Sequence, residues 1–330
     1  IKVGVIGLGV GLHHLKAYHN NKNCKILAIC DFDKNKLIKA KKKYPKTIFT
    51  SNPDELFSNK ELDIISIASF DNFHFNHLKS AIINKKHIFI EKPLCLTKKE
   101  LIQIENLRKR YPRKIISSNM VLRANPRFGY LKKLYEENKF NKLYCIEADY
   151  YWGRFEKLFG WRARIDNYSL ILGASIHLID LILWIINKKP VFVQAFGNRI
   201  GANKNMINSN TFSSIILTFK DNLFVKINAH GLCVHPHFHS IKFFSSNSTF
   251  IHQFNNAFFI ENKKIKNISN KPYPFKENRH EIIDSFINSI KGNKDSKLLV
   301  SIKSIFDTMS ICLAAIDSEK KGKIIRIKYY

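Results

Sequence analysis

The chain has 330 residues, of which 45% are apolar and 12% aromatic. This composition is typical of a folded globular protein and excludes a disordered or low-complexity chain. The formal net charge is +29, but the lysines are scattered and not clustered, which argues against a nucleic-acid partner. Three interpretations of the charge stay open: a solvated lysine-rich surface from an A/T-rich coding sequence, an anionic small substrate, or a polyanionic partner.

The cysteines predict neither a zinc site nor a disulfide framework. None of the six forms a CxxC pair or a regular spacing, so we expect reduced thiols and no bound metal. No charged leader or cleavage site precedes the apolar start, and we expect a cytoplasmic location. The length exceeds the roughly 250 to 300 residues at which a single core stops growing, so two domains are predicted.

Short apolar runs alternate with lysine-rich helical segments in the first part of the chain. The apolar runs are residues 2–6, 25–30, 63–68, 86–90 and 114–118, and the helical segments between them include 37–44, 75–84 and 98–111. Strands that alternate with helices build a parallel, doubly wound sheet with helices on both faces. The prediction for residues 1–119 is therefore an α/β domain.

The rhythm changes after residue 120. A helix is predicted near 126–137, a strand at 144–152, an apolar helix at 172–184, several antiparallel strands within 191–259, helices at 279–291 and 301–319, and a last strand at 323–328. Residues 120–330 are thus expected to form an α+β domain with an open, mainly antiparallel sheet. The apolar stretch has 17 residues from Leu170 to Ile186 and contains Asp180, so it is too short and too polar for a membrane span.

The turn after the first apolar run carries a glycine pattern. A dinucleotide fingerprint requires Gly-x-Gly-x-x-Gly between a strand and a helix, whose N-terminus then faces the pyrophosphate. Gly7 and Gly9 match, Val10 lies between them and the helix, and Gly11 stands one place before the third glycine. Asp31 ends the second apolar run, where a carboxylate accepts hydrogen bonds from ribose hydroxyls and favours NAD, with NADP still possible. A tight turn with an ordinary strand-end Asp is the alternative.

The tripeptide Glu91-Lys92-Pro93 directly follows the fifth apolar run. This is the carboxyl edge at which open α/β sheets bind ligands. The Lys92 amine is placed there to contact a substrate oxygen and polarise it. A surface turn is the alternative.

Seven segments in series resemble the glucose-fructose oxidoreductase / inositol dehydrogenase / MocA-like (Gfo/Idh/MocA) oxidoreductases. They are "VGVIGLGVGLHH", "AICDFD", "DIISIASFDNFH", "HIFIEKPLCLT", "SNMVLRANPRF", "GWRARI" and "LGASIHLIDLILW". The resemblance implies an N-terminal Rossmann domain that holds NAD(P) and a C-terminal domain that binds substrate and mediates oligomerisation as a dimer or tetramer through its sheet. It implies a sugar, sugar nucleotide or cyclitol as substrate, and no nucleic-acid or membrane partner.

The resemblance also implies roles for individual residues. Ser69, Asp71, Asn72, His74 and Glu91 would line the cofactor, Lys92 would contact the reacting oxygen, Arg123 would lie near the pocket, and His177 would be the general acid/base. The family commonly has Asp-x-Gly-x-His-x-x-Asp on this helix, preceded by three glycines. Here His177 and Asp180 are present, but Gly173 replaces the first Asp, and Asn167, Tyr168 and Ser169 replace the glycines.

The missing carboxylate leaves several alternatives. Residues four apart share a helix face, so Gly173 is expected to leave open space one turn before His177, while Asp180 continues the same side toward the substrate. One alternative is that His177 and Lys92 are sufficient for catalysis. A second is that Tyr151 or Asp166 takes the place of the missing carboxylate, and a third is that catalysis is weak. A buried histidine held by Asp180 is the structural alternative.

Two further clusters lie in the second half. The stretch 150–164 supplies Tyr151, Trp161 and Arg162, which we expect in a pocket wall, because aromatic rings stack on sugars and guanidinium groups bind phosphates or carboxylates. An interface or core loop is the alternative. His235, His237 and His239 have the period of one strand face, and we expect them to line the sheet and not to bind a metal.

The sequence thus predicts an NAD-dependent oxidoreductase that transfers hydride between nicotinamide and a secondary alcohol or ketone of a sugar derivative, in surface polysaccharide synthesis. An alternative of another class is a cofactor-bound sensor or scaffold with impaired catalysis, which the glycine at position 173 favours.

Overall fold

The computed structural model describes residues 1–254, 256–293 and 297–330. These residues fold into two compact units. Unit 1 consists of Ile1–Met120 and Glu277–Ile305, and unit 2 consists of Val121–Lys276 and Phe306–Tyr330. The segment 277–305 thus packs with the first part of the chain. The assignment of cofactor binding to residues 1–119 and of substrate binding and oligomerisation to residues 120–330 stays a prediction.

Unit 1 contains a parallel sheet with the strand order β3-β2-β1-β4-β5-β6, which is that of a dinucleotide-binding Rossmann domain. The strands are β1 (Lys2–Ile6), β2 (Lys25–Cys30), β3 (Ile48–Thr50), β4 (Ile64–Ile67), β5 (His87–Ile90) and β6 (Ile116–Ser118). The predicted α/β class is confirmed. Strand β3 was not predicted, because this edge strand has only three residues and Ile48 is half exposed.

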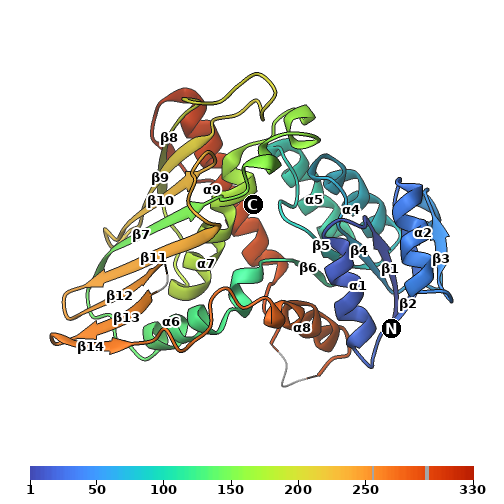
Figure 1. The fold of residues 1–330 in the computed structure, drawn as a ribbon, viewed down its shortest axis with the longest axis horizontal. Helices are drawn as coiled ribbons and strands as arrows, with labels where there is room; N and C mark the ends of the chain where they lie inside the picture. The colour runs from blue at the N-terminus through green and yellow to red at the C-terminus, as the bar shows by residue number, and fades with distance from the viewer. Residues whose placement is uncertain (255, 294–296) are drawn as a thin grey trace. The chain divides into compact units, whose positions relative to one another are not determined.

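Helices cover the sheet of unit 1. They are α1 (Gly11–Asn20), α2 (Lys34–Lys43), α3 (Asp54–Ser58), α4 (His74–Ile83), α5 (Lys98–Arg110) and α8 (His280–Ile290), with short 3-10 turns at Asp71–Phe73 and Glu277–Arg279. Helix α8 lies beside α1 (Figure 1). Phe286 packs on Phe89 of β5 at 5.7 Å between ring centroids, and Asn21 donates to Asp284 at 2.6 Å. These contacts explain why a late segment belongs to unit 1.

Unit 2 contains a mixed, mainly antiparallel sheet in the order β14-β13-β12-β11-β7-β10-β9-β8-β15, which confirms the predicted class of this part. Its strands are β7 (Leu143–Tyr151), β8 (Phe192–Asn198), β9 (Phe212–Thr218), β10 (Phe224–His230), β11 (Phe238–Ser245), β12 (Ser248–Gln253), β13 (Asn256–Glu261), β14 (Lys264–Asn267) and β15 (Ile325–Arg326). Strands β7 and β10 pair in parallel.

Helices pack on one face of this sheet (Figure 1). They are α6 (Pro126–Glu136), α7 (Ile176–Ile186) and α9 (Ile302–Lys321), with short helical turns at Val121–Ala124, Phe155–Leu158 and Arg162–Arg164 and a π-helical turn at Ile171–Ser175. Side chains of β7 alternate between the faces, with Ile146, Ala148 and Tyr150 buried. The other face, which carries Asp149 and Tyr151, is partly exposed. Among the described residues, no helix meets the length and hydropathy that a bilayer crossing requires.

Candidate functional site

The turn between β1 and α1 depends on its glycines. Gly7 has a φ of +92°, and a Cβ there would overlap the Ala68 carbonyl oxygen. Gly11 lies close to the sheet, because a Cβ built on it would be 3.2 Å from the Ala68 Cβ. Gly11 therefore fulfils the close-packing role of the third fingerprint glycine, one position early. A Cβ on Gly9 would meet nothing within 4 Å, so another molecule has room to approach this backbone.

The N-terminus of α1 carries no competing acceptor from its own residues. Its N-cap Val10 provides no side-chain cap, and the first helical turn contains no acidic residue. Val10 and Leu12 are 47% and 53% exposed. A helix start with these properties attracts anions, because its N–H groups and macrodipole point outward. These residues fit the pyrophosphate of a dinucleotide.

Asp31 joins the glycine turn to the end of β2. It is 4% exposed, its Oδ2 accepts from the Leu8 N–H at 2.6 Å, and its Oδ1 accepts from the Asp33 N–H at 2.8 Å. The Lys36 Nζ lies 4.0 Å from Oδ2. Each carboxylate oxygen has two acceptor positions, so Asp31 both fixes the turn and keeps capacity for a ribose hydroxyl.

Two aromatic residues that were not predicted as site residues lie at this edge of the sheet. Phe32 follows Asp31 and is 67% exposed, and its ring centroid is 5.5 Å from that of Phe70, which follows β4. An exposed ring and a partly exposed ring, after the two strands that flank β1, suit contact with a planar heterocycle. The signal was available, since each aromatic residue comes directly after a strand-end polar residue.

The segment after β4 holds four of the predicted cofactor residues. Asp71 and Asn72 form a partly exposed 3-10 turn, and the Ser69 Oγ lies 3.0 Å from the His77 Nδ1. His74 is fully buried, with its Nδ1 2.6 Å from the Pro93 carbonyl and its Nε2 3.1 Å from the Ser69 carbonyl. Because both ring nitrogens contact backbone, His74 connects the loop after β4 to the segment that carries Lys92.

Glu91 lies in a buried hydrogen-bond network. Its Oε1 is 3.0 Å from the His14 Nε2 and accepts from the Asn119 Nδ2 at 2.6 Å, and the His14 Nδ1 is 3.0 Å from the Ser66 Oγ. Burial raises the pKa of Glu91, but the hydrogen bonds of His14 and Asn119 and the charges of His14 and Lys92 outweigh it, so the pKa is lowered. Lys92 itself is partly buried.

This network changes the role expected for Glu91. The carboxylate is directed into the protein, where it ties the end of β5 to α1 and to the residue after β6. His14 and Asn119 were not predicted as its partners. The position of His14 in the sequence, one turn into α1, does not indicate that a buried carboxylate lies beside it.

In unit 2, His177 lies on a helix whose neighbouring residues are buried, and it is itself partly exposed. The Tyr150 ring stacks on it with centroids 5.9 Å apart and an angle of 11° between planes, and His239 lies at 6.1 Å. The His239 Nδ1 in turn hydrogen-bonds the Tyr273 hydroxyl. His177 is therefore surrounded by aromatic and imidazole rings of the sheet.

Arg123 and Asp180, both predicted to contact substrate, bind each other. The Arg123 Nε donates to the Asp180 Oδ2 at 2.9 Å, and Nη2 donates to Oδ1 at 2.6 Å. They are 6% and 1% exposed, and Thr308 donates to Asp180 at 3.4 Å. The pair connects the turn before α6 to α7 and supports the helix of His177 from within. The Asp180 carboxylate is bound to Arg123, so it does not extend the polar side of the helix toward a substrate, as was expected.

The aromatic residues predicted in a pocket wall do not all lie together. Tyr151 points to the face opposite Tyr150, with its ring between His230 at 5.1 Å and His235 at 4.3 Å. Trp161 and Arg162 stack on each other at 4.1 Å and are partly exposed. Tyr151 is thus separated from His177 by the sheet, whereas Tyr150, its neighbour in sequence, contacts His177.

The expectation of one face for His235, His237 and His239 was wrong. His235 stacks on Tyr151, whereas His237 and His239 contact Tyr150 on the other face. The strand begins only at Phe238, after Pro236, so strand alternation does not apply across the three histidines. Within the described ranges, no group of three His, Cys, Asp or Glu side chains suits a metal ion.

The expected open space at Gly173 is filled. A Cβ there would overlap the Tyr168 hydroxyl and would lie 3.4 Å from the Trp152 ring. Gly173 belongs to the π-helical turn Ile171–Ser175, and its N–H donates to the Ser169 carbonyl at 2.9 Å. The Tyr168 phenol therefore occupies the place that a side chain at position 173 would take.

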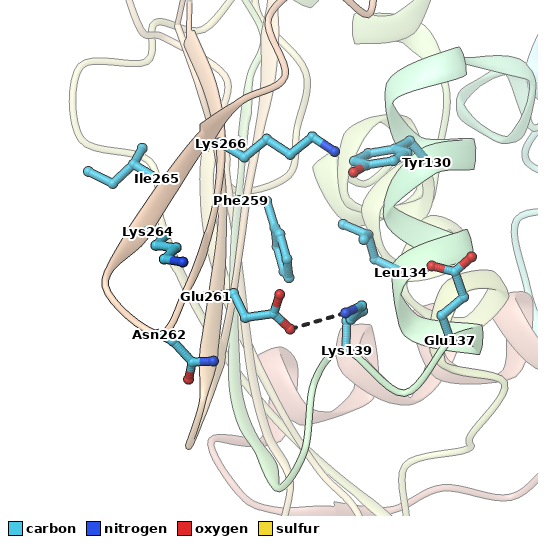
Figure 2. A pocket seen from close by; sticks show the side chains of 10 residues that line it. All are labelled: Tyr130, Leu134, Glu137, Lys139, Phe259, Glu261, Asn262, Lys264, Ile265 and Lys266. Carbon is cyan, nitrogen blue, oxygen red and sulfur yellow. Dashed lines mark hydrogen bonds and ion pairs between the residues drawn. The ribbon is translucent and has the colours of Figure 1, made fainter.

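A separate pocket of about 450 Å³ lies between α6 and the β13–β14 hairpin (Figure 2). Its walls include Tyr130, Phe259 and the ion pair between Lys139 and Glu261, whose atoms are 3.3 Å apart. None of the predicted site residues lines it. Of its polar side chains, Lys139 and Glu261 bind each other, and we assign no chemistry to it.

Two family models match successive parts of the chain. Residues 1–118 match the model of an oxidoreductase family with an NAD-binding Rossmann fold, and residues 128–251 match the GFO/IDH/MocA C-terminal domain. An uncharacterized oxidoreductase of Synechocystis sp. is 27% identical over 190 residues, 56% of this chain and 51% of that protein. Inositol 2-dehydrogenase 2 of Saccharopolyspora erythraea is 21% identical over 197 residues, 59% of this chain and 56% of that protein.

The matched stretch spans about half the length of these curated relatives. Among solved structures, scyllo-inositol dehydrogenase from Lactobacillus casei with bound NAD(H) and scyllo-inositol has a TM-score of 0.82. The identity is 19%, and the alignment covers 99% of this chain and 98% of that one, which shows a common fold. The glycine turn, the two successive family models and the common fold agree, and the chain belongs to the Gfo/Idh/MocA family of oxidoreductases, with a Rossmann domain followed by the family's C-terminal domain.

Proposed function

We propose that the protein is an NAD-dependent oxidoreductase acting on a secondary alcohol or the corresponding ketone of a cyclitol or sugar derivative. The observation that carries the proposal is the uncapped start of α1 beside Gly9, where the backbone is open to an anion. The names of distant relatives, inositol dehydrogenases among them, support this substrate class. Surface polysaccharide synthesis is the finer hypothesis for the pathway.

The cofactor residues have distinct proposed roles. The turn at Gly7–Gly11 and the α1 N-terminus would bind the pyrophosphate, Asp31 would bind the adenosine ribose, and the ring pair of Phe32 and Phe70 would contact one side of the adenine. Ser69, Asp71 and Asn72 contact the cofactor from the segment after β4, and His74 holds that segment. A buried carboxylate disfavours a 2'-phosphate, so we expect NADH to bind more tightly than NADPH.

For the chemistry, Lys92 and His177 are the proposed catalytic residues. Bound NAD supplies the hydride acceptor during oxidation. His177 takes the proton from the substrate hydroxyl, and the Lys92 ammonium stabilises the negative charge that develops on that oxygen. In reduction the same proton returns from His177 to the oxygen. Trp161 and Arg162 are the proposed substrate contacts outside this pair.

The first test is cofactor binding, measured by NADH fluorescence. Gly9→Val should keep the melting temperature within about 2 °C and weaken NADH binding at least about tenfold, because its side chain enters the space that the pyrophosphate needs. Gly7→Ala is the matched contrast: it should lower the melting temperature, because the Cβ overlaps the Ala68 carbonyl. Equal NADH affinity of Gly9→Val and the unsubstituted protein would contradict the proposed site.

The second test addresses catalysis. Lys92→Ala and His177→Ala should each lower kcat by about a hundredfold or more in a screen of cyclitols and sugars, with NADH affinity nearly unchanged for His177→Ala. Cofactor binding without turnover of any substrate would favour the alternative function, a cofactor-bound sensor or scaffold. The absence of a carboxylate at position 173 is the observation that keeps this alternative.

We also propose that two copies associate through the partly exposed face of the nine-stranded sheet. Phe192, Phe196 and Phe224 on this face are 42%, 50% and 39% exposed, and exposed apolar surface on a sheet marks an interaction site. Light scattering should show a dimer or tetramer, and Phe224→Glu should shift it toward the monomer. A monomer at all concentrations would contradict this part of the proposal.

A further inference from the structure

Tyr168 and Gly173 are complementary in shape. Tyr168 is 5% exposed, and its hydroxyl and Cζ are the two atoms nearest to the place of a Cβ on Gly173. A buried phenol has no free space to withdraw into. A tyrosine at position 168 therefore requires a glycine at position 173.

The local backbone explains how the phenol reaches this place. The Ser169 Oγ accepts from the Ile171 N–H at 3.1 Å, and the Ser169 carbonyl accepts from the Gly173 N–H at 2.9 Å. Ser169 thus accepts the hydrogen bonds at the start of the helical segment. The side chain of Tyr168, the residue before it, lies along the π-helical turn. Such turns occur frequently at functional sites.

His177 lies about one helical turn after Gly173. Side chains four residues apart on a helix are neighbours, with Cβ atoms about 5 to 6 Å apart, and they lean toward the helix N-terminus. The His177 imidazole consequently leans toward the level of Gly173, where the Tyr168 hydroxyl lies. The Tyr150 ring stacks on the imidazole, and Trp152 lies between Tyr150 and Gly173.

We propose that Tyr168 is a positioning residue for His177, and this rests on the proposed function. Its phenol replaces the side chain that residue 173 lacks, limits the orientations of the imidazole, and presents to it a neutral hydroxyl in place of a carboxylate. The two departures from the family pattern, at 167–169 and at 173, are then one compensated change. The site is built for a base without an anionic neighbour on this side.

The groups that face His177 define what a titration reports. Tyr150 and His239 of the sheet contact the imidazole, and the Tyr168 phenol lies against Gly173, one helical turn before it. The carboxylate of Asp180, on the same helix, is paired with Arg123. A carboxylate placed at position 173 would stabilise the imidazolium, whereas the phenol does not.

The test begins with Tyr168→Phe, which keeps the ring and removes only the hydroxyl. We expect an unchanged melting temperature, a kcat lowered about tenfold, little change in KM, and a shifted pH profile of kcat/KM. A tyrosine that only fills space predicts no change in kcat or in the pH profile. That result would overturn the proposal.

A second pair of variants tests the compensation. Gly173→Asp should lower the melting temperature, because the new side chain overlaps the phenol, and it should lower it less in a Tyr168→Gly background, from which the phenol is absent. In the double variant the His177 imidazole, followed by NMR and assigned with His177→Gln, should titrate about one pH unit higher than in the Tyr168→Gly variant, because a carboxylate stabilises the imidazolium. An equal loss from Gly173→Asp in both backgrounds, or an unmoved titration, would contradict the proposal.

These readouts separate the two hypotheses. The NMR titration and the melting temperatures need neither substrate nor cofactor. If NADH does not bind but both measurements behave as expected, the proposed function fails while the geometric coupling of Tyr168, Gly173 and His177 stands. If NADH binds and turns over but Tyr168→Phe is silent, only the role of Tyr168 fails.

Discussion

At the scale of single residues, several polar side chains expected at a ligand are bound to the protein itself. His74 contacts two backbone carbonyls, and Arg123 and Asp180 bind each other. Buried polar groups must find partners, and a sequence does not tell whether that partner is a ligand or another side chain. These residues keep the functional segments in place.

Breaking the buried pair should be costly to stability. Arg123→Met leaves the Asp180 carboxylate buried without its main partner, and we expect a loss of about 3 to 5 kcal/mol in the free energy of unfolding, measured with urea. Combining Arg123→Met with Asp180→Leu should recover most of this loss, since an apolar pair needs no compensation. If both variants are equally destabilised, the cost comes from packing and not from the unpaired charge.

The glycines show what was predictable at this scale. The pattern at Gly7, Gly9 and Gly11 predicted the turn, because a tight turn and close packing restrict these positions to glycine. The partner of Gly173 was not predictable, since Tyr168 is close in sequence but reaches the helix only through the π-helical turn. Likewise, alternation along β7 does not say which of Tyr150 and Tyr151 faces the helices.

At the scale of elements, most of the ranges that were predicted individually agree with the structure within one or two residues, whereas the strands of residues 191–259 were predicted only as a group. β1 and β2 match their predicted ranges, and α6 differs from its range by one residue. The short edge strand β3 and the π-helical turn were missed, because neither has a periodic apolar pattern of sufficient length. The contacts that join the elements could not be predicted from the sequence either. An example is the hydrogen bonds of Glu91, which connect α1 to the ends of β5 and β6.

This network predicts a pH-dependent contribution to stability. The folded state lowers the pKa of Glu91 below 4.5, so the carboxylate stabilises the fold above about pH 4.5, and this contribution disappears as the pH falls through the lowered value. Glu91→Gln keeps an acceptor oxygen but loses the charge, and should cost about 1 to 2 kcal/mol at pH 7. Urea unfolding of both proteins from pH 7 to well below pH 4.5 measures the difference, which should shrink only below pH 4.5.

Glu61→Gln is the matched control for this measurement. Glu61 also has a lowered pKa, caused by its hydrogen bond with Lys2, and both side chains are exposed. Exposed ion pairs contribute little, so this substitution should leave stability nearly unchanged at every pH. A loss as large as that of Glu91→Gln would mean that the network adds nothing beyond a surface ion pair.

At the scale of the whole molecule, each unit contains histidines that are partly or fully buried. Burial lowers the pKa of His77 and His87 in unit 1, and of His237 in unit 2, to about 4, and that of His252 in unit 2 to about 3. His87 accepts a hydrogen bond from the Ile115 N–H, and the His252 Nδ1 faces the Arg127 guanidinium. Protonating Nδ1 of His87 or of His252 would break these contacts, so both units depend on neutral imidazoles.

The consequence is a loss of stability in weak acid. Unfolded histidines bind protons below about pH 6.5 and these folded ones do not until about pH 4, so the free energy of unfolding should fall steadily as the pH drops between these values. His87→Asn retains an acceptor for Ile115 but does not titrate, and should reduce the slope by up to about 1.4 kcal/mol per pH unit. Urea unfolding at several pH values, followed by circular dichroism, provides the measurement. A stability that stays constant from pH 7 to pH 5, or the same slope in His87→Asn, would show that these imidazoles are accessible to protons in the folded protein.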